Sequence, residues 1–405
     1  MNYGVIIVGA GGRMRGLIFW FALAALFVAN PCVHQGRLEA GGAAQADASD
    51  AAPGIDPGAQ PIAPYHPRFG RTRPVIAVIG ESAGTETTDY IIPYGVLTQS
   101  GAAEVVAVGT ETGPIQMMPA LRIEPQATIE AFDARFAQGA DYLIVPAVHN
   151  QDDPQLIAWV AAQAAKGATV VGVCDGVWVV ANAGLLKGRS ATGHWYSLNA
   201  LERKFSDTKW LRNRRYVADG PIITTTGVTA SVPASLALVE AIAGRERAAK
   251  VARELGAADW SPVHNSNDFK PDTHYLLTAV GNTLSFWSHQ DVGIALSPGT
   301  DEIALALIAD AYSRTYRSQA LSVSRSSDAV LTRRGLKVIP DRVAGTSGQP
   351  GLMLPPFDSI PPVPALDWAL GRIADAYGPA TGAFVALQME YQPSPAGSPT
   401  PAPGR

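Results

Sequence analysis

The chain has 405 residues, of which 47% are hydrophobic and 16% charged, so it can bury a sizeable core and is not wholly disordered. Its 31 basic and 35 acidic side chains give a formal net charge of −4, which provides no general electrostatic surface for nucleic acid. Two cysteines in this length exclude a disulfide-rich scaffold and a cysteine-rich zinc module.

Residues 1–35 have the pattern of a targeting segment. Gly16–Ala29 contains no charged residue and follows two arginines, Arg13 and Arg15. Because this apolar run is shorter than the roughly 20 residues of a spanning helix, it indicates a signal peptide, with an uncleaved membrane anchor as the alternative. We therefore expect an exported or membrane-anchored protein of the periplasm or cell envelope. Met14 is an alternative start, and Cys32 lacks the small neighbours of a lipoprotein site.

Two flanking segments are rich in small residues and proline and show no apolar periodicity. Residues 36–72 predict a flexible linker, and residues 393–405 predict a disordered tail. The folded part of the chain is expected between them.

Residues 73–256 alternate between short apolar runs and helical stretches. The apolar runs, each a predicted strand, are Pro74–Gly80, Gly101–Gly109, Ala140–Ala147, Ala168–Cys174 and Pro221–Gly227. The predicted helices include Pro154–Lys166, Val177–Leu186 and Ala234–Leu255. Strands that are apolar on both faces favour an α/β fold with a parallel sheet covered by helices.

Two loops could carry a nucleophile. Gly80–Gly84 is GESAG, the G-x-S-x-G of a serine hydrolase elbow, but it follows the first strand and has no upstream oxyanion loop, so we interpret it as a polar loop. Gly172–Gly176 is GVCDG, between a strand and a helix predicted to begin at Gly176. Cys174 on that turn would face backbone N–H groups and a helix N-terminus, which favour a thiolate. A small buried side chain is the alternative.

The run CDGVWVVANAGLLKGRSATGHW, from Cys174 to Trp195, resembles the ThiJ/PfpI family of the class I glutamine amidotransferase-like superfamily. The similarity is strongest to the amidase-like domains of AraC-type regulators and to isonitrile hydratases. DYLIVPA before this run, and RYVADGPIITTTGVTAS and SLALVEAIAG after it, support the resemblance, which covers residues 73–256. It implies a flavodoxin-like three-layer sandwich with the cysteine on the nucleophile elbow.

The resemblance also implies two partners for the thiol. Asp89 aligns with the family's acid, which would hydrogen-bond the thiol or exchange protons with it, and Glu86 is the runner-up. His194 matches the family's histidine near the cysteine, where it would polarise the thiolate or shuttle a proton. The predicted catalytic residues are therefore Cys174, His194 and Asp89. The alternative for either acid, Asp89 or Glu86, is a helix-start carboxylate, and the alternative for His194 is a structural histidine.

Two positions depart from the family pattern. Ala147 and Val148 stand where the family often has two glycines that shape the oxyanion pocket, so a narrower pocket is expected. Asp175 follows the cysteine in place of a small or hydroxyl residue and would oppose a thiolate. The predicted substrate pocket comprises these three residues with Gly176 and Glu86.

Residues 291–392 resemble a truncated copy of the first half, with a connector at 257–290. The corresponding segments are Asp291–Arg314 with Pro74–Gly101, Gly335–Asp341 with Ala120–Gln126, and the segment from Pro364 with that from Pro233. The stretch that holds the cysteine has no counterpart, so we predict a degenerate second α/β copy without a nucleophile. It is expected to pack on the first as in an intramolecular pseudo-dimer, with a homodimer as the alternative.

No cofactor or metal is predicted. His264, Asp268, Asp272 and His274 lie close in sequence, but in a loop-like segment whose spacing fits no standard metal site. No helix-turn-helix pair follows residue 256, so no nucleic-acid partner is expected.

Two functions remain. The first is a cysteine-dependent hydrolase, hydratase or lyase acting on a small molecule. The alternative is a non-catalytic ligand-binding or sensing module derived from the amidase-like domain of a transcriptional regulator. An activated thiol in an open pocket would favour the enzyme, and a buried, unreactive Cys174 would favour the module.

Overall fold

The computed structural model describes residues 61–392, all within the compact unit Asp56–Arg405. The predicted signal or anchor segment, most of the predicted linker and the predicted tail lie outside the described residues. Within residues 61–392, no helix is both long enough and apolar enough to cross a membrane.

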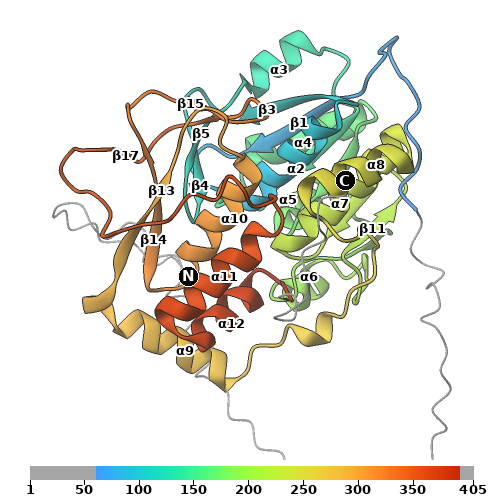
Figure 1. The fold of residues 1–405 in the computed structure, drawn as a ribbon. Coiled ribbons are helices and arrows are strands. Elements are labelled where there is room, and N and C mark those ends of the chain that lie inside the picture. The colour runs from blue at the N-terminus through green and yellow to red at the C-terminus, as the bar shows by residue number, and fades with distance from the viewer. Residues whose placement is uncertain (1–60, 393–405) are drawn as a thin grey trace, which may run out of the picture. The chain divides into compact units, whose positions relative to one another are not determined.

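A seven-stranded sheet organises the first half of the fold (Figure 1). Its strands, in spatial order, are β11 (Tyr216–Asp219), β12 (Ile222–Thr225), β8 (Thr169–Gly172), β7 (Tyr142–Val145), β1 (Val75–Gly80), β3 (Glu104–Gly109) and β6 (Ala127–Thr128). Neighbouring strands are parallel except for the antiparallel pair β11–β12. All five predicted strands are present. Numbered along the chain, they follow the spatial order 2-1-3-4-5 of flavodoxin-like sheets.

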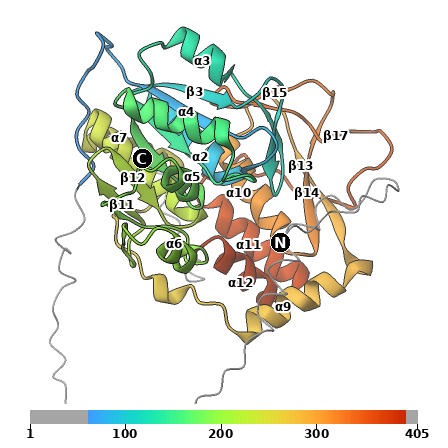
Figure 2. The same cartoon turned by 180° about the vertical axis from the view of Figure 1, so that it is seen from behind.

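Helices cover both faces of this sheet, which confirms the expected three-layer sandwich. The helices on one face, turned to the viewer in Figure 2, are α3 (Ile129–Arg135), α4 (Pro154–Ala165) and α5 (Gly176–Asn182). Those on the other face are α2 (Thr87–Ser100), α7 (Ser231–Ala243) and α8 (Arg245–Leu255). Successive residues of β1 point to opposite faces, so Ile76 joins the core with α2 while Ala77 joins the core with α4.

The predicted helix Ala234–Leu255 is in fact two helices. Gly244 separates α7 from α8 and has φ 85° and ψ 164°, a conformation that a side-chain-bearing residue rarely adopts. Apolar residues continue with helical spacing on both sides of this glycine, which is why the pattern alone predicts one helix. The helix predicted through Val177–Leu186 begins at Gly176, as expected from the elbow pattern, but already ends at Asn182.

The second, partial α/β region follows from residue 290. Its parallel strands, in spatial order, are β17 (Arg342–Val343), β14 (Ser318–Ser324), β13 (Gln290–Ala295) and β18 (Leu352–Met353). Its helices are α10 (Glu302–Ser313), α11 (Ala365–Tyr377) and α12 (Pro379–Gln388).

The elements of this region correspond to those of the first half. β13–α10–β14 repeats the parallel unit β1–α2–β3, and each helix is capped by an acidic residue after Gly-Thr, Glu86 in α2 and Asp301 in α10. Gly378 breaks α11 from α12 with φ 93° and ψ 151°, as Gly244 breaks α7 from α8. These matches support the predicted copy, while the predicted domain boundaries stay a prediction.

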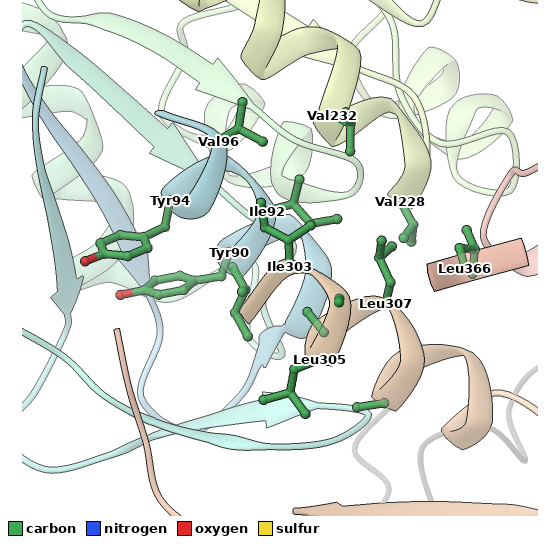
Figure 3. Close-up of a cluster of buried hydrophobic side chains, with 14 of the residues drawn as sticks. Tyr90, Ile92, Tyr94, Val96, Val228, Val232, Ile303, Leu305, Leu307 and Leu366 are labelled. Carbon is green, nitrogen blue, oxygen red and sulfur yellow. The ribbon is translucent and has the colours of Figure 1, made fainter. Parts of the chain in front are cut away.

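The two regions share a sheet and a core. The shared sheet runs in the order β15 (Val330–Leu331), β16 (Lys337–Val338), β5 (Arg122–Glu124), β4 (Ile115–Met118) and β2 (Thr85–Glu86). Residues of α2, α7, α10 and α11 form one apolar cluster (Figure 3). Gly95 permits the close approach of α10 to α2, because a Cβ at this position would lie 2.7 Å from Cγ1 of Ile303. The pairing of β5 with β16 places two of the corresponding sequence segments directly against each other.

The remaining described elements lie outside these sheets and layers. They are β9 (Ser190–Ala191), α6 (Leu198–Lys204), β10 (Lys209–Trp210), η1 (Val228–Ala230), η2 (Ser266–Asp268), α9 (Thr273–Leu284) and η3 (Phe286–Ser288). The end of the predicted linker is held on the first half, because Arg71 forms a 2.7 Å ion pair with the buried Asp141 and Tyr65 N–H donates to the Ala241 carbonyl.

Candidate active site

Cys174 lies on a sharp turn between β8 and α5, as predicted. Its φ of 53° is in the left-handed region, which typically costs a non-glycine residue about 1–3 kcal/mol. The Cys174 N–H donates to Oγ1 of Thr225 over 3.1 Å, and the Gly176 N–H donates to the Val173 carbonyl over 2.8 Å. The next strand of the sheet and the turn itself therefore hold the strained cysteine in place.

Gly176 is required for this geometry. A Cβ there would overlap the Val145 carbonyl oxygen and lie 2.7 Å from that of Pro146. The start of α5 therefore lies directly against the end of β7, which brings Cys174 close to the carboxyl ends of the neighbouring strands. In sheets of this order, ligands bind at the carboxyl ends of the strands where the strand order reverses, here between β1 and β7.

Asp89 and Glu86 occupy the first turn of α2, after β1 and β2. Glu86 caps the helix by accepting the Asp89 N–H over 2.6 Å, so the helix-start alternative is confirmed for Glu86. Asp89 is fully buried, and its Oδ2 accepts the Ala147 N–H over 3.2 Å. Its Oδ1 has no hydrogen-bond partner. Of the two predicted acids, Asp89 is thus the one with a free oxygen.

An arginine of the second region enters the same buried cluster. Nη2 of Arg314 lies 2.7 Å from Oε1 of Glu86, and its Nε lies 2.8 Å from Oδ1 of Asp310. Burial opposes the charge of Arg314, but Asp310 and Glu86 more than offset it and raise the pKa of the guanidinium. The pair of Asp310 and Arg314 was not predicted from the sequence. The available signal was an Asp and an Arg four residues apart at the end of an otherwise apolar helix.

The sulfur of Cys174 is buried, whereas the turn was expected to favour a thiolate. Cys174 is only 6% exposed. Burial raises the pKa of its thiol well above the ordinary range, and the charges of Asp89 and Asp175 raise it further. The N-terminus of the seven-residue α5 cannot compensate, because a helix end contributes at most about 2 kcal/mol whereas full burial shifts a pKa by up to about 3–5 units.

Asp175 and His194 form the more accessible side of the site. Both are partly buried, and each has a buried atom without a hydrogen-bond partner, Oδ1 of Asp175 and Nε2 of His194. Burial raises the pKa of Asp175, and the charge of His194 partly counteracts this rise. The interactions described within residues 61–392 thus place His194 beside Asp175, and none of those described for Cys174 involves His194.

The end of α12 closes this side of the site. Glu390 follows α12, is 3% exposed, and accepts the Gly227 N–H over 2.6 Å. Its other oxygen lies 2.7 Å from Nε2 of His264, which places this histidine of the sequence cluster in a hydrogen bond. The Trp195 indole donates to the Leu387 carbonyl over 3.3 Å. Residues of the second region therefore flank the site on two sides.

The loop after β7 forms the remaining wall. The Glu86 N–H donates to the Ala147 carbonyl over 2.8 Å, and Val148 forms a β-bridge with Thr85. The Ala147 N–H points to Asp89 rather than to an empty oxyanion position. The structure therefore places Glu86, Asp175 and Gly176 close to Cys174 and the loop of Ala147 and Val148 against the start of α2, whereas two surface hollows of about 360–370 Å³ lie elsewhere.

Comparison with known proteins identifies the domain. The model of the DJ-1/PfpI family matches residues 75–241. These residues form a DJ-1/PfpI family domain. The chain is 28% identical to isonitrile hydratase of Pseudomonas putida over 195 residues, which cover 46% of this chain and 78% of that protein. It is 30% identical to the HTH-type transcriptional regulator CdhR of Pseudomonas aeruginosa over 122 residues, which cover 30% of this chain and 36% of the regulator.

Solved structures of other members resemble the DJ-1/PfpI domain. DJ-1beta of Drosophila melanogaster aligns over 46% of this chain and 100% of its own, with 21% identity and a TM-score of 0.41. A ThiJ/PfpI family protein of Pseudomonas syringae aligns over 51% of this chain and 83% of its own, with 23% identity and a TM-score of 0.41.

Replacing Asp89 by asparagine should change how the stability of the domain depends on pH. Burial raises the pKa of the Asp89 carboxyl well above its ordinary 3.8, and the charge of Glu86 raises it further. Between the ordinary and the raised pKa, the folded state binds a proton that the unfolded state has lost, so stability falls as pH rises. Asp89→Asn removes this loss while keeping an acceptor for the Ala147 N–H.

Urea unfolding of both proteins from about pH 4 to about pH 8 measures the effect. The free energy of unfolding should fall less with pH in the variant than in the wild type. Identical pH profiles would show that Asp89 titrates as an ordinary carboxyl.

Proposed function

We propose that this protein is a cysteine-dependent enzyme of the cell envelope that hydrates or hydrolyses a small, uncharged electrophile at Cys174. The observation that carries the proposal is a buried thiol on a strained elbow together with the buried carboxyl of Asp89, whose Oδ1 has no partner and whose charge acts on that thiol. The similarity to isonitrile hydratase over 78% of that protein supports a hydratase. The predicted export supports the location.

Burial raises the pKa of both the Cys174 thiol and the Asp89 carboxyl, so both groups hold their protons more firmly. Such a pair suits an addition reaction that needs no free thiolate. Asp89 would give its proton to the terminal carbon of an isonitrile, which carries a lone pair, while the sulfur of Cys174 bonds to that carbon and the thiol proton passes to Asp89. With an isonitrile, R–NC, the product is a thioimidate, R–N=CH–S–Cys. Addition of water to its carbon and departure of the sulfur then give the formamide R–NH–CHO and restore the thiol.

The charges around the site favour an uncharged substrate. Glu86, Asp175, Asp310 and Glu390 surround it with carboxyl groups, whereas Arg314 is already shared between two of them. An anionic substrate would therefore find no unpaired cation among these groups. The side chains of Ala147 and Val148, where glycines would leave more room, favour a small substrate.

Turnover of an alkyl isonitrile by the full-length protein tests the proposal. The infrared N≡C band should disappear as the formamide forms, and Cys174→Ser should lower the rate by about 10³-fold or more. Asp89→Asn should lower it by about 10²–10⁴-fold, since a positioned proton donor contributes that much. Cys32→Ser is the matched control, because it removes the other cysteine, and should retain the wild-type rate.

The proposal fails if turnover survives Cys174→Ser, or if isonitriles, amides and dicarbonyl compounds are all left unchanged. The latter result would favour the second candidate, a ligand-binding module. The burial of Cys174, the raised pKa of its thiol and the similarity to two HTH-type regulators, CdhR and GbdR, support that candidate.

A further inference from the structure

An apolar surface lies at the periphery of the second region, away from the cysteine site. It consists of Leu277, Val280 and Leu284 on α9 and of Phe286 and Trp287 on η3, and we call it the α9 surface. These side chains are between 38% and 76% exposed. Within residues 61–392, ten large hydrophobic side chains are exposed, and five of them are gathered here. α9 lies at the edge of the fold in both views (Figures 1 and 2).

The opposite face of α9 holds the helix on the protein. Asn282 is buried and donates from Nδ2 to the Thr315 carbonyl over 2.9 Å and to Oγ1 of Thr381 in α12 over 3.1 Å. The Nε2 of His289 lies 2.9 Å from the Asn282 carbonyl oxygen and ties η3 back to the helix. The apolar side chains, at spacings i, i+3 and i+7, are thus fixed outward on a helix with a polar anchor.

The exposed apolar side chains are not needed for the fold. The repeated units begin at β1 and β13, and no helix precedes β1 in the described residues 61–74. α9 is thus an addition to the second unit. Burying apolar side chains stabilises a protein by roughly 25 cal/mol per Å², so leaving five of them in water is unfavourable unless something covers them.

We propose that the α9 surface docks on a lipid bilayer and dips into its interfacial region. From Thr273 to Gln290 the chain has no Asp, Glu, Lys or Arg, whereas protein–protein interfaces are bordered by a polar rim. Phenylalanine and tryptophan at the end of the apolar face suit the membrane interface, where aromatic side chains concentrate. The ligand is a zwitterionic or neutral lipid surface, because no cation of this segment would select anionic headgroups.

The chain outside the described residues fits the same partner. Gly16–Ala29 is uncharged but shorter than the roughly 20 residues that span a bilayer, and residues 30–60 join it to the described part. Stable attachment to a membrane usually takes two signals. The α9 surface supplies the second one, and this inference does not depend on the chemistry of Cys174.

Fluorescence of Trp287 in the full-length protein tests the inference directly. The chain has eight tryptophans, and Trp20 lies in the N-terminal apolar run, so the Trp287 signal is taken as the wild-type spectrum minus that of Trp287→Phe. With phosphatidylcholine vesicles that carry brominated acyl chains, this difference signal should shift to shorter wavelength and be quenched. An unchanged difference signal overturns the inference, even if the protein binds vesicles through its N-terminal run.

A variant with two negative charges introduced into the α9 surface provides a second test. Leu277→Glu with Leu284→Glu should lower the affinity for these vesicles about tenfold or more, since a carboxylate in the interface is unfavourable. The matched control is Leu331→Glu with Met353→Glu, two side chains that are 53% and 45% exposed elsewhere on the second region, and it should bind like wild type. Circular dichroism verifies that both variants fold.

Sedimentation velocity without lipid distinguishes the competing occupant. The inference requires the wild type and the Leu277→Glu, Leu284→Glu variant to sediment alike. A wild-type dimer that this variant dissociates would show that a second copy of the chain covers the α9 surface, and would overturn the lipid inference.

Discussion

Replacing Arg314 by methionine is expected to lower the free energy of unfolding by about 3–5 kcal/mol. The arginine side chain is 8% exposed and is the cation between two buried carboxylates, those of Glu86 and Asp310. Methionine has a similar length but no charge, so both carboxylates would remain buried without compensation. Removing one partner of a buried ion pair costs far more than the pair itself contributes. Urea unfolding followed by tryptophan fluorescence measures the change.

Arg333→Met is the matched control for this prediction. Arg333 also pairs with a helix-capping carboxylate, Asp301, over 3.1 Å, but its side chain is 49% exposed. An exposed pair contributes about 0–1 kcal/mol, so this variant should unfold nearly as the wild type does. Equal effects of the two substitutions would show that the Arg314 cluster is not held together by its charges.

The Arg314→Met substitution should also change the chemistry of the cysteine site. The charge of Arg314 acts to lower the pKa of Asp89, so its loss should raise that pKa further. In the reaction proposed above, Asp89 would then give up its proton less readily. Arg314→Met should therefore slow turnover in the folded fraction, which would show that the second region contributes to the site rather than only covering it.

Gly176→Ala is expected to lower the free energy of unfolding by about 3 kcal/mol or more and to abolish reactions of Cys174. The added methyl group would overlap the Val145 carbonyl oxygen and lie 2.7 Å from that of Pro146, and backbone atoms cannot rotate away. Moving α5 outward would pull Cys174 from its 3.1 Å hydrogen bond to Thr225. Thermal unfolding and alkylation of the thiol report the two effects.

Gly371→Ala is the control for the added methyl group. Gly371 is exposed within α11, and a Cβ there would meet nothing within 4 Å. Because alanine favours helices over glycine by about 0.5–1 kcal/mol, this variant should be as stable as the wild type or more stable. If Gly176→Ala behaved in the same way, the tight elbow would not be the native conformation.

The layers of the fold and the place of the cysteine were predictable because they depend on local patterns. The five apolar runs between residues 74 and 227 could only be buried strands, and each appears within a few residues of its predicted bounds. The strand–Gly–Val–Cys–Asp–Gly–helix pattern around Cys174 likewise determines a tight turn, since glycine on either side allows the close approach. The acid at position 89, by contrast, was implied by the resemblance to the ThiJ/PfpI family and not by a local pattern.

The chemical state of the site depended on residues that the sequence places far apart. Arg314 meets Glu86 across 228 positions, and Glu390 meets Gly227 across 163. The spacing of hydrophobic residues does not predict these contacts, because they depend on how α10 and α12 pack on the first region. Cys174 belongs to the apolar cluster that joins the two regions, and its burial raises the pKa of its thiol instead of lowering it.

The sequence by itself thus determined the α/β layers, the second partial α/β region and the elbow, because hydrophobic spacing and glycine positions act over a few residues. Only the tertiary structure decided which charges surround the thiol, on which side the second region closes the site and which face of α9 stays exposed. These properties depend on solvent access, which is set by contacts between distant segments and not by the local order of residues.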